Sequence, residues 1–258
     1  MLRFKNLGSG SSGNATLVHA LSGSESTTLL VDCGLGIRNL EQRAAEAGVL
    51  LSDLDAIFIT HEHSDHIGCA RSLARRYRIP VWMSEGTHRG LRDGDFEDLL
   101  RIAAHEQPID LGALLLHPFE VPHDAGEPLQ LRCTDGDAHL GILTDLGHVP
   151  PDVIEALAGC GTLMLECNHD AEMLAEGPYP WFLKKRVGGD FGHLANAAAA
   201  EAARAWLPRG LKQVVAAHLS RQNNRPDLAR QVMAQALGCG PQDVHVADQD
   251  TGTPWLRA

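Results

Sequence analysis

The sequence contains no long hydrophobic segment and no pair of closely spaced cysteines. No apolar run approaches the roughly eighteen residues that a membrane-spanning helix requires. The opening residues, Met-Leu-Arg-Phe-Lys-Asn, lack the apolar core of a secretion signal. The six cysteines are scattered without a Cys-x-x-Cys motif, which is typical of reduced thiols rather than of a disulfide framework. These absences predict a soluble, cytoplasmic protein that does not associate with a membrane.

Positive charge is also scarce. The formal net charge is −11 at pH 7, so the chain as a whole does not attract nucleic acid or an anionic membrane by its charge. A substrate that contains phosphate is still compatible with this charge, because bound divalent ions reverse the local field. The arginines between Arg71 and Arg78 are spaced like one solvated helix face. A second basic cluster, Lys184-Lys185-Arg186, precedes a glycine-rich segment.

No linker and no internal repeat divides the chain. Its 258 residues, with 44% hydrophobic content, are enough to bury one sizeable core. Self-similarity at a fixed period of about 20–50 residues, which marks repeat proteins, is absent. We therefore expect a single domain that spans residues 1–258.

Apolar alternation and helical spacing predict the order of the elements. Strands are expected at 2–7, 15–20, 27–31, 54–60, 80–83, 113–121, 129–133 and 138–144, and helices at 35–48 and 67–77. Strands then alternate with helices from 150 to 248, whereas residues 84–108 show no clear pattern. This order, with polar residues at strand ends, predicts an α+β fold in which two sheets pack face to face under helices.

The most informative stretch is His61-Glu62-His63-Ser64-Asp65-His66, which directly follows an apolar, β-prone run. Side chains two positions apart in an extended chain point to the same side, so His61 and His63 can converge on one ion. Asp65 and His66 enter the following helix and can face a second ion. Imidazole and carboxylate suit zinc, manganese or iron, and two such ions about 3.5–4 Å apart form the usual hydrolytic pair. The alternative is a polar helix start, capped by Asp65, with solvated histidines.

Further polar groups follow apolar strands elsewhere in the chain. They are His123-Asp124, Thr144-Asp145, Asn168-His169-Asp170 and His218. Each group alone is more commonly a helix cap or a hydrogen-bonded residue, but their shared placement indicates one site. Asp32 ends the third strand, and we expect it behind the metal ligands, where a carboxylate orients them. The turn from Gly8 to Asn14 is either a tight turn or a backbone cradle for phosphate.

These motifs, taken together with three others, resemble the metallo-β-lactamase superfamily, and more narrowly its YycJ/WalJ-type branch. The others are Asp32-x-Gly34, Gly192-His193-Leu194-x-Asn196 and His218-Leu219-Ser220-x-x-Asn223-Asn224. The resemblance covers nearly the whole chain apart from residues 84–108. It implies a four-layer αββα sandwich with a dinuclear metal site at one edge of the paired sheets. For this branch it also implies a nuclease-like phosphodiesterase that acts on DNA ends as a 5′ exonuclease.

The resemblance also implies roles for individual residues. One ion would bind His61, His63 and His123, and the other Asp65, His66 and His218, with Asp145 bridging both. The ions would be Zn²⁺ or Mn²⁺, with iron as a further candidate. Around the ligands or the substrate would lie Asp32, Asn168, His169 and Asp170. Cys69 and Ala195 stand where glycine and serine are usual; neither change removes a ligand, but Ala195 lacks a hydroxyl for a phosphate.

The implied mechanism is hydrolysis by a metal-activated water. Two ions that share a water lower its pKa from about 15.7 toward about 7, which makes hydroxide available at neutral pH. Asp65 would hold this nucleophile in line, and His193 would protonate the leaving alkoxide. The expected substrate-binding residues are Lys184, Lys185, Arg186, Asn196 and Arg225. For the basic triplet the alternative is a solvated surface turn.

Three functions therefore need comparison. The first is phosphodiester hydrolysis of nucleic acid, with DNA favoured over RNA. The second is hydrolysis of a thioester, another small ester or a lactam on the same scaffold, and the third is non-catalytic binding. The complete ligand set argues against the third function. Asp145 argues against classical lactamases, and the motifs around His193 and His169 favour phosphodiesters. The sequence does not predict the oligomeric state.

Overall fold

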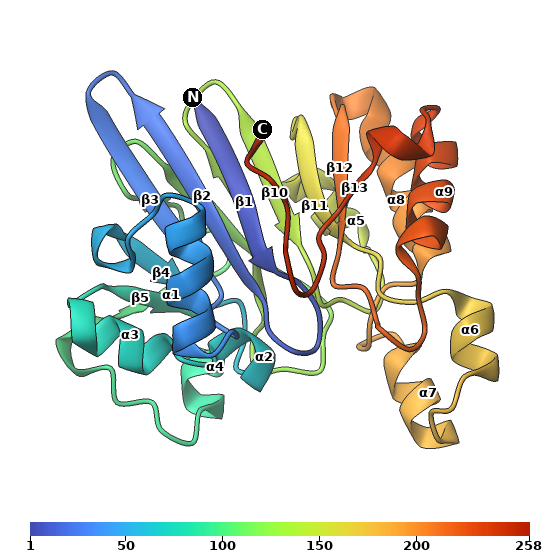
Figure 1. The fold of residues 1–258 in the computed structure, drawn as a ribbon, viewed down its shortest axis with the longest axis horizontal. Helices are drawn as coiled ribbons and strands as arrows, with labels where there is room; N and C mark the ends of the chain where they lie inside the picture. Colours follow the sequence, from blue (N-terminus) through green and yellow to red (C-terminus); the bar gives the residue numbers. More distant parts are fainter.

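The computed structural model describes residues 1–258 and contains two seven-stranded sheets (Figure 1). The strand order is β14-β1-β2-β3-β4-β5-β6 in the first sheet and β13-β12-β11-β10-β9-β8-β7 in the second. The strands are β1 (Leu2–Gly8), β2 (Ala15–Ser22), β3 (Glu25–Val31), β4 (Ala56–Phe58), β5 (Val81–Met83), β6 (Leu100–Ile102), β7 (Ile109–Asp110), β8 (Leu115–Glu120), β9 (Leu129–Thr134), β10 (His139–Leu143), β11 (Thr162–Glu166), β12 (Gln213–Ala217), β13 (His245–Val246) and β14 (Leu256–Arg257).

The helices lie outside the sheets and at one end of them. They are α1 (Ile37–Glu46), α2 (Ser64–Ile67), α3 (Ala70–Tyr77), α4 (Glu85–Gly90), α5 (Pro151–Ala156), α6 (Ala171–Glu176), α7 (Trp181–Val187), α8 (Asn196–Trp206) and α9 (Pro226–Leu237). Short 3-10 helices occur at Leu51–Asp53, Glu97–Leu99, Leu207–Arg209 and Pro241–Asp243. None of these helices combines the length and the hydrophobicity that crossing a membrane requires. In Figure 1, α6 and α7 project from the lower right of the sandwich.

Three apolar layers hold the molecule together. The middle layer lies between the sheets and includes Phe58 from the first sheet and Ile142 from the second. A second layer joins the first sheet to α1 and α3, and a third joins the second sheet to α5, α8 and α9. Alternation along a strand separates the layers: Phe58 belongs to the middle layer, while its neighbours Ile57 and Ile59 face the helices. The architecture is therefore the predicted αββα sandwich.

Parallel strands determine where the functional residues gather. Strands β3, β4 and β5 are parallel in the first sheet, and β10, β11, β12 and β13 are parallel in the second. The carboxyl ends of the parallel strands in each sheet therefore lie along one edge of that sheet. In Figure 1 this edge is the lower one, close to α2. The two chain termini lie together at the opposite end, where the Ala258 backbone N–H donates to the Leu2 carbonyl at 3.2 Å.

Most predicted elements are confirmed, and the exceptions have local causes. The helix expected at 67–77 begins earlier and is split into α2 and α3. The break falls at Gly68, whose φ of 31° is left-handed and whose Cβ, if present, would lie 2.4 Å from the Cys33 carbonyl oxygen. The strand expected at 54–60 is only β4, because a 3-10 turn precedes it. The stretch 84–108, which had no clear pattern, forms α4, a 3-10 turn and β6.

Candidate metal centre

Three site residues lie within two positions of a strand end and have an unusual backbone. Asp32 follows β3, Asp145 follows β10 and His218 follows β12. Their φ angles are 61°, 57° and 55°. A left-handed conformation costs a non-glycine residue about 1–3 kcal/mol and persists only where its surroundings fix it. The chain therefore accepts strain at three places to direct these side chains toward one site.

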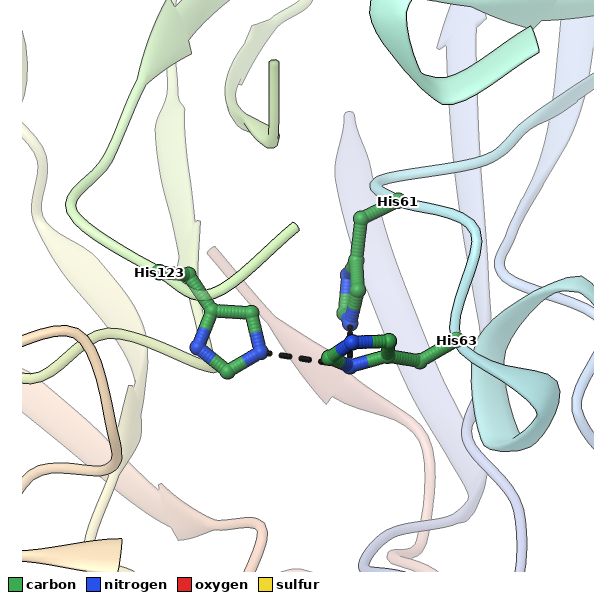
Figure 2. A group of neighbouring side chains, drawn as sticks. All are labelled: His61, His63 and His123. Atoms are coloured by element: carbon green, nitrogen blue, oxygen red, sulfur yellow. Dashed lines mark hydrogen bonds between the residues drawn. The ribbon is translucent and has the colours of Figure 1, made fainter. Parts of the chain in front are cut away.

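His61, His63 and His123 form the first ligand group. His61 Nε2 lies 3.1 Å from His63 Nδ1, and His123 Nε2 lies 3.4 Å from the same Nδ1. Figure 2 shows the three rings directed at a common point from two separate loops. Neutral imidazole nitrogens at this spacing can all reach one ion at the usual nitrogen-to-zinc distance of about 2.0–2.1 Å. The three histidines that the family resemblance assigns to one ion therefore do converge.

Asp65, His66 and His218 form the second group. Asp65 Oδ2 lies 3.6 Å from His66 Nε2 and 3.7 Å from His218 Nε2. Both histidines are buried, whereas the Asp65 side chain keeps 23% of its surface exposed. The motif at the start of α2 thus supplies ligands to two neighbouring points, as its spacing predicts.

Asp145 lies between the two groups. Its Oδ2 is 3.2 Å from His66 Nε2, its Oδ1 is 3.3 Å from His218 Nδ1, and it also clusters with His61. Asp145 Oδ2 and His218 Nε2 are both buried and form no hydrogen bond. Leaving such groups unsatisfied costs about 1–3 kcal/mol each. A metal ion would satisfy both, so the residues present fit divalent metal ions.

Asp32 and Thr60 fix the orientation of two ligand rings. Asp32 Oδ2 accepts a hydrogen bond from His66 Nδ1 at 2.8 Å, and Oδ1 accepts from the Thr60 backbone N–H at 2.9 Å. The Thr60 hydroxyl donates to the Asp32 carboxylate and lies 3.0 Å from His61 Nδ1, from which it can accept. With Nδ1 engaged, Nε2 of both rings is left to bind metal. Asp32 therefore lies behind the ligands, where the sequence predicts it.

Glu166, at the end of β11, is a central residue that the sequence reasoning missed. Its Oε1 lies 2.9 Å from both His193 Nδ1 and His218 Nδ1. Its Oε2 accepts from the backbone N–H groups of Leu146 at 3.1 Å and Leu194 at 3.0 Å. Burial alone would raise the pKa of this carboxyl, but the charges and hydrogen bonds of His193 and His218 lower the pKa to about 2. A carboxylate inside an apolar strand requires partners of this kind, which is the signal that could have identified it.

The carboxylates also affect the histidines. Burial would lower the pKa of His218, but the charges of Asp145 and Glu166, with the hydrogen bond that Nδ1 donates to Glu166, raise it to about 10. Burial would likewise lower the pKa of His193, but the charge and hydrogen bond of Glu166 raise it. For Asp145, burial is outweighed by the charges of His218 and His66, and its pKa lies well below the usual range. The carboxylates therefore stabilise positive charge at this centre, whether a histidine or a bound cation carries it.

A cavity of about 370 Å³ opens onto this centre. Its lining includes Asp65, Asp145 and His193 of the centre, together with Tyr179 and residues of α7, among them Arg186. His193 keeps 24% of its side chain exposed. Ser11, from the Gly8 to Asn14 turn, also lines the cavity. The cavity thus brings together the ligand groups, His193 and one arginine.

The side chain of Asn14 holds the turn from Gly8 to Asn14 in place. Asn14 Oδ1 accepts from the Gly10 N–H at 2.8 Å, and the Asn14 backbone N–H donates to the Asp65 carbonyl at 2.8 Å. The segment after β3 also packs tightly against the backbone of Asp65. A Cβ on Gly34 would lie only 1.7 Å from the Asp65 carbonyl oxygen. These contacts make it a tight turn that supports the loop carrying Asp65.

The basic triplet lies on α7, and its members differ in position. Arg186 lines the cavity, and its Nε donates to Asp124 Oδ2 at 2.6 Å. Lys184 and Lys185 do not line it: Lys184 Nζ donates to the Ala175 carbonyl at 2.6 Å, and Lys185 Nζ lies 5.4 Å from the Trp181 ring centroid. Of the three residues expected to bind flanking phosphates, only Arg186 therefore lies at the cavity itself. Helical spacing separates the three side chains, which sequence proximity alone did not reveal.

Asn196 and Arg225 are not placed to bind a substrate in the cavity. Asn196 is 2% exposed, and its amide exchanges hydrogen bonds with the amide of Asn224 at 2.9 Å. Arg225 precedes α9, outside the cavity lining, and its guanidinium bonds Asp227 at 3.2 Å. The substrate-binding roles expected for both residues are therefore not supported by their positions. Asn196 instead joins the start of α8 to the segment before α9.

Asn168, His169 and Asp170 have separate positions. Asn168 Nδ2 donates to the His218 carbonyl at 2.9 Å and so holds the backbone of a ligand. His169 is buried, and its Nδ1 has no hydrogen-bond partner. Its ring packs beside Gly188, because Nε2 lies 4.0 Å from the position that a Cβ on this glycine would occupy. Asp170 caps α6 by accepting from two backbone N–H groups. Only Asn168 is thus tied directly to the metal centre, through the backbone of His218.

Fold, ligand geometry and sequence now agree on one class of protein. A family model for the beta-lactamase superfamily domain matches residues 27–219, and the chain belongs to this metallo-β-lactamase superfamily. It is 35% identical over 265 residues to exodeoxyribonuclease WalJ of Streptococcus pneumoniae, with 98% of this chain and 96% of that protein covered. It is also 35% identical over 244 residues to exodeoxyribonuclease YycJ of Bacillus anthracis, with 92% and 89% covered.

Solved structures support the same fold. YhfI of Bacillus subtilis matches with a TM-score of 0.76 at 19% identity over all of both chains. Zinc-bound PqqB of Methylobacterium extorquens matches with a TM-score of 0.75 at 17% identity, with 99% of this chain and 100% of that chain covered. At such identities the likeness shows the fold alone. The predicted family, its branch and its fold are confirmed, and the protein is a metal-dependent hydrolase of this fold.

Proposed function

We propose that the protein is a phosphodiesterase that degrades nucleic acid, with DNA favoured over RNA and degradation from a 5′ end. The observation that carries the proposal is the pairing of a complete ligand set with His193, which Glu166 holds in the lining of the same cavity. The full-length similarity to two proteins named exodeoxyribonucleases supports it.

Two divalent ions, Zn²⁺ or Mn²⁺, would occupy the two ligand groups. His61, His63 and His123 would hold one ion, and Asp65, His66 and His218 the other, with Asp145 shared. Bound there, the ions would activate a water and draw charge from the phosphate oxygens.

The chain itself positions the reacting groups. Asp65 directs Oδ2 toward two histidines, so its partly exposed carboxylate has Oδ1 left to accept a hydrogen bond from the attacking water and orient it. His193 donates Nδ1–H to Glu166, and the charge and hydrogen bond of Glu166 raise its pKa, which favours a proton on Nε2 as well. The proton on Nε2 can then pass to the leaving alkoxide, and such a proton transfer typically raises the rate about 10²–10⁴-fold. Arg186, at the cavity wall, can bind a non-bridging phosphate oxygen.

Hydrolysis of a thioester or of another small ester or lactam is the second candidate, because it would use the same ligands. A side-by-side assay of bis-p-nitrophenyl phosphate, a thioester and nitrocefin separates the candidates. We expect the phosphodiester to be hydrolysed fastest, and this activity to disappear with chelator and return with Zn²⁺ or Mn²⁺. Preference for the thioester or nitrocefin would replace the proposal, and no chelator-sensitive activity on any substrate would favour a binding protein.

The nucleic-acid substrate is tested with end-labelled single- and double-stranded DNA and RNA. A 5′ exonuclease releases a 5′ label at once as a short product, whereas a 3′ label stays on progressively shorter fragments. We expect DNA to be degraded faster than RNA. Faster cleavage of RNA, or internal cuts before any terminal product, would overturn that part of the proposal.

A further inference from the structure

Helix α7 is a segment without a buried residue. Trp181 is 74% exposed and Phe182 68% exposed, and Phe191, in the loop that follows, is 61% exposed. These three are the only Trp and Phe side chains of the chain that are exposed. We call them the aromatic platform. Exposed aromatic side chains that gather in one segment mark an interaction surface more often than chance.

Helix α7, which carries Trp181 and Phe182, adjoins the cavity of the metal centre, and Phe191 directly precedes Gly192, which lines it. Leu183, Arg186 and Val187 of α7 line that cavity. With about 100° between successive residues, Phe182 lies one turn from Arg186 on the flank of the helix. Trp181 is on the far side, one turn from Lys185, whose Nζ is 5.4 Å from the indole ring centroid. A path therefore leads from the cavity past Arg186 and Phe182 to Trp181.

The charge of α7 indicates what could cover these rings. The helix carries three basic residues and no acidic one, in a chain with a formal net charge of −11. A second copy docked through α7 about a two-fold axis would place like charges against each other. A single nucleic-acid strand matches both features, because its bases have flat π faces and its phosphates are anionic. Paired bases inside a duplex are already stacked on their neighbours and cannot stack on these side chains.

We propose that Trp181, Phe182 and Phe191 stack with successive unpaired bases of a strand whose scissile phosphate is held in the cavity, so that the strand entering the site is single-stranded. Lys185 and Arg186 would contact the phosphates between those bases. This inference rests on the proposed phosphodiesterase function. It adds a preference for unpaired ends that the metal ligands alone do not supply.

The test compares three substrates on the full-length, metal-loaded protein. They are a single-stranded thymidine oligonucleotide, the same oligonucleotide with abasic sites near its end, and bis-p-nitrophenyl phosphate. The variants are Trp181→Ala, Phe182→Ala and Phe191→Ala, singly and together, with Trp181→Phe as the conservative change. Leu50→Ala is the matched control, because Leu50 is 62% exposed and lies outside the platform.

We expect each lost stacking contact to raise the KM for the thymidine oligonucleotide by roughly 5- to 150-fold. The change should be much smaller for the abasic oligonucleotide and for the small diester. Trp181→Phe should keep most of the affinity, and Leu50→Ala should behave like the wild type. A triple variant whose KM values for the normal and abasic oligonucleotides change in parallel would show that the rings do not stack on bases.

Two further outcomes are distinguishable. If the wild type hydrolyses no phosphodiester, the proposed function fails, and stacking is then judged by whether the oligonucleotide quenches Trp181 fluorescence. Loss of this quenching in Trp181→Phe would support the proposal that the rings bind bases. Absence of quenching in the wild type would contradict it. If sedimentation shows a wild-type dimer that dissociates in the triple variant, the platform is an interface between copies and the inference is overturned.

Discussion

Replacing Glu166 with glutamine tests whether the metal centre depends on this buried carboxylate. The change keeps the size of the side chain but replaces one acceptor oxygen by an NH₂ donor. Oε1 faces Nδ1 of His193 and of His218, and Oε2 faces two backbone N–H groups. Whichever way the amide is turned, its NH₂ meets two donors. No rotamer of glutamine can therefore accept hydrogen bonds from all four of these N–H donors.

The magnitude follows from those contacts. Two buried donors would lose their acceptor, at about 1–3 kcal/mol each, so the free energy of unfolding should fall by roughly 2–6 kcal/mol. His218 would also lose the partner that fixes its ring, and loss of such an outer hydrogen bond typically weakens metal binding about 10- to 100-fold. His193 would lose the negative charge that raises its pKa.

The measurements are metal affinity by competition with a chelator, denaturant unfolding, and hydrolysis of bis-p-nitrophenyl phosphate. Glu155→Gln is the matched control, because that carboxylate is 67% exposed and bonds Arg209 at 2.7 Å on the surface. We expect the control to resemble the wild type in all three measurements. A Glu166→Gln variant with wild-type metal affinity and wild-type stability would refute the role assigned to Glu166.

Three other predictions concern the cavity. Asp145→Ala should lose binding of both metal ions, because one carboxylate is shared by the two groups, and metal analysis that finds two equivalents retained would contradict this. His193→Ala should slow hydrolysis of unactivated phosphodiesters by about 10²–10⁴-fold but affect p-nitrophenyl esters far less, because p-nitrophenolate departs without a proton; equal losses would place the acid elsewhere. Arg186→Ala should raise the KM for oligonucleotides and flatten its salt dependence by about one unit of slope. Arg225→Ala, outside the cavity lining, should change neither. Equal effects of the two changes would show that Arg186 acts only through the overall charge of the surface.

The metal ligands could be predicted from the sequence because their geometry is local. The alternation that ends β4 sends His61 and His63 to one side, and the start of α2 sends Asp65 to a neighbouring point. His66 lies in the same helix, while His123, Asp145 and His218 each follow a strand of the second sheet, and the carboxyl ends of its parallel strands share one edge. Strand order and periodicity therefore predicted that these residues share one edge, whereas the division into two ligand groups came from the family resemblance.

The remaining site residues depend on contacts between distant segments. Glu166 is part of an apolar strand, and nothing near it in sequence shows that two histidine nitrogens converge on it. Asn196 looks like a substrate ligand beside His193, but it begins α8 and pairs with Asn224. Lys184 and Lys185 were likewise expected beside Arg186, but helix α7 directs adjacent side chains about 100° apart. Sequence proximity therefore predicted which residues converge at the start of α2 but not the positions of side chains along α7 and α8.

The strain and the unpaired atoms of the metal centre have one common consequence. Asp145 and His218 each combine a left-handed backbone with a buried polar atom that has no hydrogen-bond partner. Each of these features lowers stability, and a bound ion would satisfy both unpaired atoms at once. An ion present at 100 times its dissociation constant adds about 2.7 kcal/mol to the free energy of unfolding. Stability should therefore rise with Zn²⁺ or Mn²⁺ concentration, and this rise should be lost when the ligands are removed. The fold would then depend on the same ions as the chemistry, because the strand ends that form the site are also the points where the sandwich is strained.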